Sequence, residues 1–239
     1  MEAITRTEKI ISGENLTPIT RKEMFLAKAA GKNIETPAPI TREEMFLSQI
    51  SGGGGDSSVK DLISVIDRTV TDIKFPESLT TIGDNAFRGC TQLALTSLPE
   101  GITSIGKFAF DGCTALALTS LPEGLTSIES YTFNACANLA LTALPKGVTS
   151  IGQNSFYGCK SLALTALPKG IESINSSAFS NCTSLESVTF EGQPKSISSN
   201  AFAGCTRLTT INVPWAEGAV SNAPWGATNA TINYNYTKG

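Results

Sequence analysis

The sequence contains no histidine among its 239 residues, and only 16% of its residues are charged. Histidine is the most frequent general base and metal ligand in proteins, so its absence excludes the commonest hydrolytic and metal-dependent sites. The sequence also lacks a Gly-x-Ser-x-Gly motif and a phosphate-binding glycine loop that ends in lysine. We therefore expect a protein that is not an enzyme and that needs no cofactor and no metal ion.

A large excess of charge and long apolar runs are missing as well. The formal net charge of −3 gives no electrostatic basis for binding nucleic acid. No apolar stretch approaches the roughly 18 residues of a membrane-spanning helix, so membrane insertion is not expected. The first residues show no basic region followed by an apolar core, so no secretory signal is visible. A signal already removed by cleavage stays an open alternative.

What the sequence does contain is an internal repeat between positions 76 and 213, with a period of 23, the interval from Cys90 to Cys113. Four types of residue recur at this interval six times each, in one register and without an insertion. We call each such series of equivalent positions a column, and we number the repeats as coils 1 (76–98) to 6 (191–213). The four columns are Ile82, Ile105, Ile128, Ile151, Ile174 and Ile197; Phe87, Phe110, Phe133, Phe156, Phe179 and Phe202; Cys90, Cys113, Cys136, Cys159, Cys182 and Cys205; and Leu93, Leu116, Leu139, Leu162, Leu185 and Leu208.

A unit this short cannot bury its apolar side chains alone, but stacked units bury them in one continuous core. The segment 93–98 is expected to form a strand, 99–101 a Pro-Gly turn, and 102–105 a second strand before a tight loop. The sequence therefore predicts a solenoid that is mostly β, with parallel strands between neighbouring coils and short 3-10 or helical loops.

The repeated unit resembles the BspA-like leucine-rich repeats of bacterial surface proteins. The segment 121–128, followed by Phe133 and Cys136, shows the likeness well. In that family an aliphatic residue stands three places after the first leucine of the strand, and coils 5 and 6 follow this pattern. Coils 1 to 4 depart from it, because threonine occupies that place and a leucine stands one position earlier. We expect this earlier leucine to substitute in the core, with a bulged or shifted strand; the residues concerned are Leu95, Leu118, Leu141 and Leu164.

The cysteine column has two interpretations. One is three disulfides or a metal site. A metal site would need close pairs such as Cys-x2-Cys, and here no two cysteines are closer than 23 positions. Stacking would bring neighbouring cysteines near enough for a disulfide, but each then lies between two equivalent ones. A column of buried, reduced thiols is the simpler interpretation, because a free cysteine packs as a small apolar residue.

Both ends of a solenoid need caps that cover the open core. Residues 59–75 form an imperfect unit without the cysteine, and we expect them to be the N-terminal cap. Residues 214–239 contain Trp215 and Trp225, and we expect a C-terminal cap there, followed by an extended strand. The two indole rings are candidates either for covering the core or for contacting a protein or glycan partner.

Residues 1–51 differ in kind and contain a repeated Ile-Thr-Arg-x-Glu motif with capping-box spacing. The motif predicts short α-helices that need a partner surface, since helices of this length are marginal alone. Residues 52–58 read as a flexible glycine and serine linker. The motif resembles segments of phage tail and baseplate-associated proteins of gut Firmicutes, which implies docking and assembly through residues 1–51. A helical hairpin folded onto the solenoid and a lack of ordered structure are the alternatives. The candidate docking residues are Met24, Phe25, Leu26, Met45, Phe46 and Leu47.

The outward positions of the leucine segment are small and nearly constant, whereas the loops vary between coils. Phe108, Tyr131, Tyr157 and Lys160 lie in loops of successive coils and are candidates for contact with a partner; ordinary loop variation is the alternative. We expect a non-enzymatic binding, adhesion or structural protein that presents its solenoid to a protein or glycan on a cell surface. The settings considered are a phage tail and, alternatively, a secreted bacterial surface adhesin; an enzyme of unknown type is a remote third option.

Overall fold

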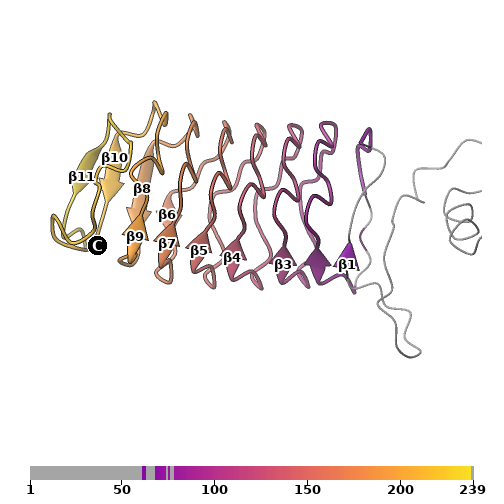
Figure 1. Ribbon diagram of the computed structural model, residues 1–239, viewed down its shortest axis with the longest axis horizontal. Coiled ribbons are helices and arrows are strands. Elements are labelled where there is room, and N and C mark those ends of the chain that lie inside the picture. Colours follow the sequence, from indigo (N-terminus) through magenta and orange to yellow (C-terminus); the bar gives the residue numbers. More distant parts are fainter. Residues whose placement is uncertain (1–60, 63–67, 74, 76–77, 238–239) are drawn as a thin grey trace, which may run out of the picture. The chain divides into compact units, whose positions relative to one another are not determined.

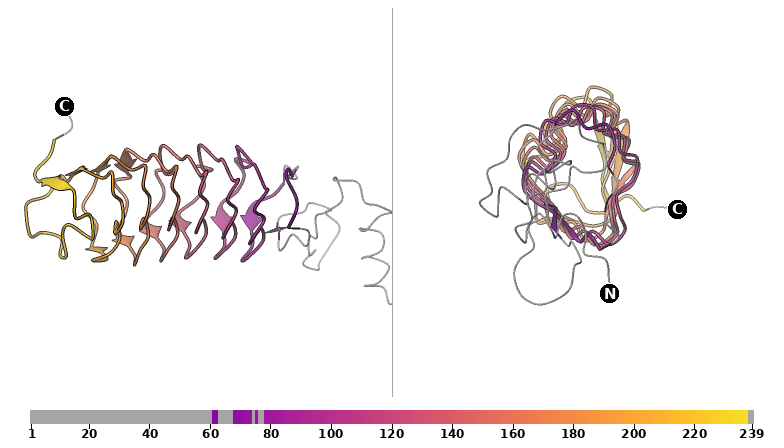
Figure 2. Two further views of the ribbon diagram at one scale, coloured as in Figure 1. Left: turned by 90° about the horizontal axis from the view of Figure 1, so that it is seen from above. Right: turned by 90° about the vertical axis from the view of Figure 1, so that its right-hand side faces the viewer.

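The computed structural model describes residues 61–62, 68–73, 75 and 78–237, all of which lie in the unit Ser48–Gly239. The predicted helices of residues 1–51 and the linker 52–58 lie outside the described residues. Within the described part the chain winds into a stack of similar coils (Figure 1). Seen along the stack, the coils superimpose around a shared interior (Figure 2).

The isoleucine column forms a parallel ladder along one side of the stack. Each strand there except β1 ends on an isoleucine, and strand pairs such as Ile128 with Ile151 are offset by one full repeat. Two sheets share this side, with strand orders β1-β2-β3 and β4-β5-β7-β9. The strands are β1 (Asp61–Leu62), β2 (Thr81–Ile82), β3 (Ser104–Ile105), β4 (Ser127–Ile128), β5 (Ser150–Ile151), β7 (Ser173–Ile174) and β9 (Ser196–Ile197).

The leucine segments form a second sheet only toward the C-terminal end, with the order β11-β10-β8-β6. All of its pairs are parallel, as the repeat predicts. Coils 1 to 3 have no strand in this segment, so the expectation of a leucine strand in every coil is wrong. The strands of this sheet are β6 (Ala166–Leu167), β8 (Ser187–Phe190), β10 (Thr210–Asn212) and β11 (Thr231–Asn233).

The positions of the buried leucines explain the missing strands. In coil 1 the chain buries Leu93, Leu95 and Leu98 and exposes Thr96, where it bends. A strand turns alternate side chains to one face, so it cannot bury two residues that are three positions apart. In coil 5 the buried pair Val188 and Phe190 has the spacing of two that a strand requires. The predicted substitution by the earlier leucine is thus confirmed, and coils 1 to 3 achieve it with a bend at the threonine.

The loops that follow the isoleucine strands are runs of turns, and no helix of any kind occurs in the described residues. The predicted 3-10 or helical loops are therefore absent from them. Backbone N–H groups alternate between two uses: Cys90 N donates to Phe87 O within the loop (3.0 Å), whereas Phe87 N donates to Ala109 O of the next coil (2.7 Å). A helix would use all of these N–H groups for hydrogen bonds within the loop. The hydrogen bonds between coils therefore exclude a helix there.

The core contains the four columns, whose members are almost entirely buried. The six phenylalanine rings stack nearly parallel, with neighbouring centroids 5.0 to 5.6 Å apart. Cys136 Sγ donates a hydrogen bond to Phe110 O at 3.0 Å, and the same bond recurs from four further thiols of the column. All six cysteines are buried and none forms a disulfide, which confirms the interpretation as a column of thiols.

The C-terminal end closes the core with tryptophan. Trp225 lies one full repeat after Phe202, has 0% exposure and donates from Nε1 to Ser221 O at 2.8 Å. Trp215 is 5% exposed and packs edge-on against Phe190 with a centroid distance of 5.2 Å. The predicted extended strand near the end is the short β11. At the other end, β1 pairs with β2 and Val70 is buried.

Candidate partner-binding edge

The candidate site lies on the loop that follows each isoleucine strand, at a position where the backbone is left-handed. Phe108 and Tyr131 both occupy this position, with φ of 58° and 60°. The same column holds Asn85 (φ 58°), Asn154 (φ 51°) and Ser177 (φ 54°) in other coils. Asparagine tolerates this conformation because its short side chain can bond locally, whereas a bulky side chain is disfavoured there.

The structure brings Phe108 and Tyr131 together as a stacked pair. Their ring centroids are 4.5 Å apart and the rings are inclined by 12°. Arg88 covers the Phe108 ring, with its guanidinium carbon 5.0 Å from the centroid, in a cation–π contact. Gln153 donates from Nε2 to the Tyr131 hydroxyl at 3.3 Å. Four consecutive coils thus contribute to one continuous row of side chains, all of them at least partly solvent-accessible.

Charged and amide groups fix the arginine at the start of this row. Arg88 Nε lies 2.9 Å from Asp111 Oδ2, and Asn134 Nδ2 donates to Asp111 Oδ1 at 2.7 Å. Arg88, Asp111 and Asn134 belong to one column, so the contact passes from coil to coil. Asp111 and Asn134 were not among the residues predicted for this site. Their positions, one and two full repeats after Arg88, were the signal that could have found them.

Tyr157 and Lys160 lie one coil further along the stack. Tyr157 follows Asn134 in the same column and is 41% exposed, one of only two large apolar or aromatic side chains in the described residues with such exposure. Lys160 is exposed in the same loop. The two residues follow Gln153 in the same coil and extend the candidate edge toward the C-terminal end. We call Arg88, Phe108, Tyr131, Gln153 and Tyr157 the aromatic edge.

The remaining candidates from the sequence fall elsewhere. Trp215 and Trp225 are buried, so their rings are part of the core and offer a partner no surface; of their two interpretations, covering the core fits their position. The candidate docking residues 24–26 and 45–47 lie outside the described residues.

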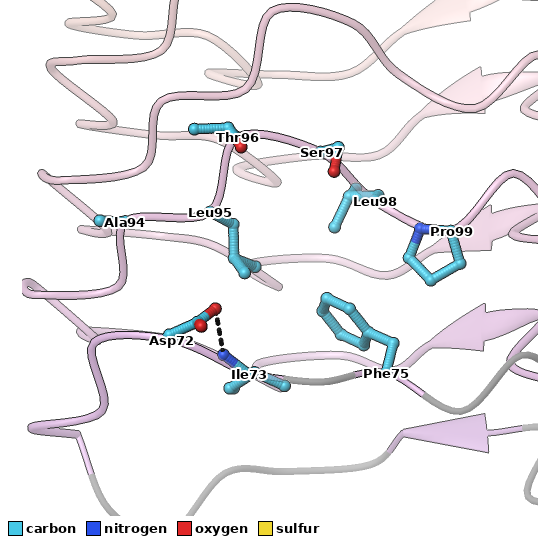
Figure 3. Close-up of a pocket in the computed structure, with 9 residues that line it drawn as sticks. All are labelled: Asp72, Ile73, Phe75, Ala94, Leu95, Thr96, Ser97, Leu98 and Pro99. Carbon is cyan, nitrogen blue, oxygen red and sulfur yellow. Dashed lines mark hydrogen bonds between the residues drawn. The ribbon is translucent and has the colours of Figure 1, made fainter.

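A shallow pocket of about 500 Å³ opens between coil 1 and the segment before it (Figure 3). Asp72 is the single ionisable residue among those that line it, and its Oδ1 accepts a hydrogen bond from Ile73 N at 2.8 Å. Phe75, Leu95 and Leu98 are among the apolar residues that line it. With only one carboxylate and small neutral neighbours, the pocket lacks the converging polar groups of a catalytic site.

Chemistry at the thiols is also disfavoured. Burial, the largest cause, raises the pKa of the Cys136, Cys159 and Cys182 thiols well above the ordinary value, and it raises that of Cys205 to about 11. A thiol that stays protonated is a poor nucleophile and a poor metal ligand. Among the described residues no cluster of three or more cysteine, aspartate or glutamate side chains could hold a metal ion. The same residues include no helix long and apolar enough to cross a membrane.

Comparison with solved structures finds several bacterial repeat proteins. A leucine-rich repeat protein from Bacteroides ovatus is 27% identical over 70% of this chain, with a TM-score of 0.58; the match spans 45% of that protein, so less than half of its length is represented here. The T. pallidum leucine-rich repeat protein is 28% identical over 70% of this chain and 85% of its own length, with a TM-score of 0.55. The pneumococcal vaccine antigen PcpA, 21% identical over 73% of this chain and 46% of its own, shares the fold with a TM-score of 0.52.

A comparison with curated protein sequences gives no match. The family model described as the BspA type leucine-rich repeat region does match, with six copies over residues 67–166 and 138–222. These residues contain all six coils, Trp215 and the whole aromatic edge. The chain therefore belongs to the family of BspA-type leucine-rich repeat proteins.

Proposed function

We propose that this protein is a non-enzymatic binding protein that presents its solenoid on a bacterial surface and holds a partner at the aromatic edge. The observation that carries the proposal is the presence of two large aromatic residues, Phe108 and Tyr131, at adjacent left-handed positions on the surface. The family and its bacterial relatives support a binding or adhesion role.

The energetics of these two positions favour a role in binding over a role in folding. A left-handed backbone costs a bulky residue about 1–2 kcal/mol, so the pair costs roughly 2–4 kcal/mol. The ring stack returns about 0.5–1.5 kcal/mol, and the contact with Arg88 returns about 0.5–1 kcal/mol. Asparagine, as found at Asn85 and Asn154, would serve the fold at a lower cost. The aromatic pair therefore supports a role in binding a partner.

The composition of the edge favours a protein partner over a glycan. Aromatic and arginine side chains dominate the energetics of protein interfaces. A sugar ring would stack on an open aromatic face, but Arg88 and Tyr131 both stack on the Phe108 ring. Tyr157, at 41% exposure, is the ring best placed for a sugar, so a glycan partner is the second candidate.

The test uses the double variant F108N/Y131N, which places asparagine at both aromatic positions, as at the equivalent Asn85 and Asn154. Fluorescently labelled wild-type and variant proteins are incubated with a panel of gut bacteria and mammalian epithelial cells. We expect the variant to fold with unchanged or higher thermal stability and to lose binding by about tenfold or more, because the contact surface is gone. The matched control is A143S, at an exposed position of the leucine segment where the preceding coil has Ser120. This variant should bind like the wild type.

Two results would contradict the proposal: equal labelling by wild type and F108N/Y131N, or no labelling of any cell by the wild type. Treating the cells with protease or with glycosidase before labelling separates the two partner classes. Loss of labelling after protease alone supports a protein partner, and loss after glycosidase alone supports a glycan.

The setting of the protein is a separate part of the proposal. Membership of the BspA-type family supports presentation at a bacterial surface, which includes secretion followed by attachment. The sequence of residues 1–51 is what supports the alternative, a tail-associated component of a phage particle assembled through that segment. Immunogold labelling of source cells and of particles purified from their cultures distinguishes these settings, since each predicts gold on only one of the two.

A further inference from the structure

Each Pro-x-Gly turn between the leucine segment and the isoleucine strand carries one charged residue at its tip. The four turns of coils 2 to 5 present Glu100, Glu123, Lys146 and Lys169, and all four residues are exposed. Reading along the stack, the order is two acidic residues followed by two basic residues. We call this row the charged corner.

The turns are held in line by close contact between coils. A Cβ atom added to Gly124 would lie 3.1 Å from Ile102 O of the preceding coil, and one added to Gly147 would lie 3.3 Å from Leu125 O. Successive turns therefore stack directly on each other, at the spacing of about 4.8 Å that parallel strands impose. The four charges form a row of fixed order and nearly constant spacing.

Within the chain this order is unfavourable. Like charges are neighbours twice, Glu100 with Glu123 and Lys146 with Lys169, and like charges placed side by side on a sheet destabilise it. Among the described residues none of the four forms an ion pair. The one contact between unlike neighbours is a long hydrogen bond, from Lys146 N to Glu123 Oε2 at 3.4 Å. The described residues therefore leave both like-charged pairs without a compensating ion pair.

Reversing the direction of the row changes every sign to its opposite. A two-fold axis that passes between Glu123 and Lys146, perpendicular to the stack, sets Glu100 opposite Lys169 of a second copy and Glu123 opposite Lys146 of that copy. We propose that the charged corner is a self-complementary interface at which two copies of this chain pair antiparallel. A two-fold interface uses the same patch on both copies, and this row satisfies that condition.

The surroundings of the corner allow such an approach. On one side the exposed positions are small and neutral, as at Ser97, Ser120 and Ala143. On the other side the exposed positions of coils 2 to 4 are Thr103, Thr126 and Thr149. The equivalent residue of coil 5, Glu172, is already paired with Lys195 at 2.8 Å. The charged side chains thus project from an edge that consists mostly of short, neutral side chains.

The pairing is expected to be weak and sensitive to salt. Exposed ion pairs contribute little each and are screened by added electrolyte, with a Debye length of about 10 Å at 0.1 M ionic strength. Many copies held on one surface would pair far more readily than free copies, because their effective concentration is high. The aromatic edge takes no part in the pairing, so this inference stands independently of the proposed function.

The test is sedimentation velocity of the full chain over a wide range of protein concentration, at low and at high salt. We expect a dimer at high concentration and low salt that dissociates when salt is added. The double variants E100K/E123K and K146E/K169E should each be monomeric under the same conditions, with association weakened by about tenfold or more. All four positions are exposed, so circular dichroism should show the fold of the wild type in each variant.

Two further samples make the test decisive. An equimolar mixture of the two double variants should form a heterodimer, because one row is then wholly basic and the other wholly acidic. The quadruple variant E100K/E123K/K146E/K169E inverts the row but keeps it self-complementary, so its dimer should return. A monomeric wild type, a double variant that dimerises as the wild type does, or a mixture that fails to associate would each overturn the proposal.

Discussion

At the scale of single residues, each loop contains a second left-handed position, which four coils fill with glycine. Gly89, Gly112, Gly158 and Gly204 have φ between 70° and 74° at this position. Coil 3 instead has Ala135, with φ of 57°. Glycine adopts this conformation without steric cost, whereas alanine is strained there. The loop geometry is thus dictated by the bonds between coils, and coil 3 departs from the best residue for it.

Replacing Ala135 with glycine is expected to stabilise the protein by about 0.5–1 kcal/mol, which is the relief of strain less the entropy that glycine adds to the unfolded chain. The change should appear in urea unfolding followed by circular dichroism. The reciprocal variant, Gly112→Ala, should lower the free energy of unfolding, because φ is 74° there. If the two substitutions changed stability in the same direction, backbone strain would not be the cause.

The buried thiols predict how stability depends on pH. Burial raises the pKa of Cys136, Cys159 and Cys182 well above the ordinary value and that of Cys205 to about 11, whereas the unfolded thiols titrate near their ordinary values. Above those ordinary values the unfolded chain loses protons that the folded chain keeps, so stability falls as pH rises. The contribution of each thiol is complete below its unfolded pKa and is lost as pH rises toward its folded pKa.

Each of these thiols should add about 1.4 kcal/mol per pH unit to the loss of stability in that alkaline range. Urea unfolding at a series of pH values measures the slope, and the variant Cys159→Ala should make it smaller. In the folded protein at neutral pH the thiols should not react with a disulfide reagent. Rapid labelling without unfolding, or an alkaline slope unchanged in Cys159→Ala, would contradict the buried, protonated column.

At the scale of the elements, stability should depend on the leucine that each leucine segment of coils 1 to 4 buries just before its threonine. The threonine itself should contribute little to stability. Leu118 is 0% exposed, whereas Thr119 is exposed. Leu118→Ala should cost about 2–5 kcal/mol of stability, because it leaves a cavity in the core. Thr119→Val, which restores the usual family pattern, should change stability by less than about 0.5 kcal/mol. Equal effects in urea unfolding would show that the segment can shift its register.

The sequence predicts the fold well, and for a definite reason. A column such as the six phenylalanines fixes which side chains meet, because stacking converts a separation of one repeat along the chain into direct contact. The bend at Thr96 was harder to foresee, since it depends on how three leucines share one interior. Trp225 was predicted as part of a cap, but its place in the phenylalanine column was overlooked.

The candidate site was only partly predictable. Phe108 and Tyr131 are evident in the sequence as aromatic residues in variable loops. Their stacking and the contact with Arg88 follow from loop geometry that the pattern does not encode. The left-handed backbone at both positions emerges only from the alternation of bonds within and between coils.

At the scale of the whole repeat array, stability is close to a sum of coils and of contacts between neighbours, so the ends should open first. Trp225 closes the C-terminal end and contacts Phe190 at a centroid distance of 5.9 Å. Trp225→Ala should expose the last coils to hydrogen exchange while the middle coils keep their protection. Trp225→Phe, which continues the phenylalanine column, should have a milder effect. A uniform loss of protection along the array in Trp225→Ala would instead indicate a single cooperative unit.

The junctions between neighbouring coils are alike, and this likeness has a consequence for the gene. Because the isoleucine strands pair at an offset of one full repeat, a whole coil can be inserted or removed without disturbing its neighbours. Tandem copies as alike as coils 2 and 3 are also substrates for unequal recombination. Copy number then becomes a heritable trait, and each event changes the reach of the protein by about 4.8 Å while the chemistry of its ends stays the same.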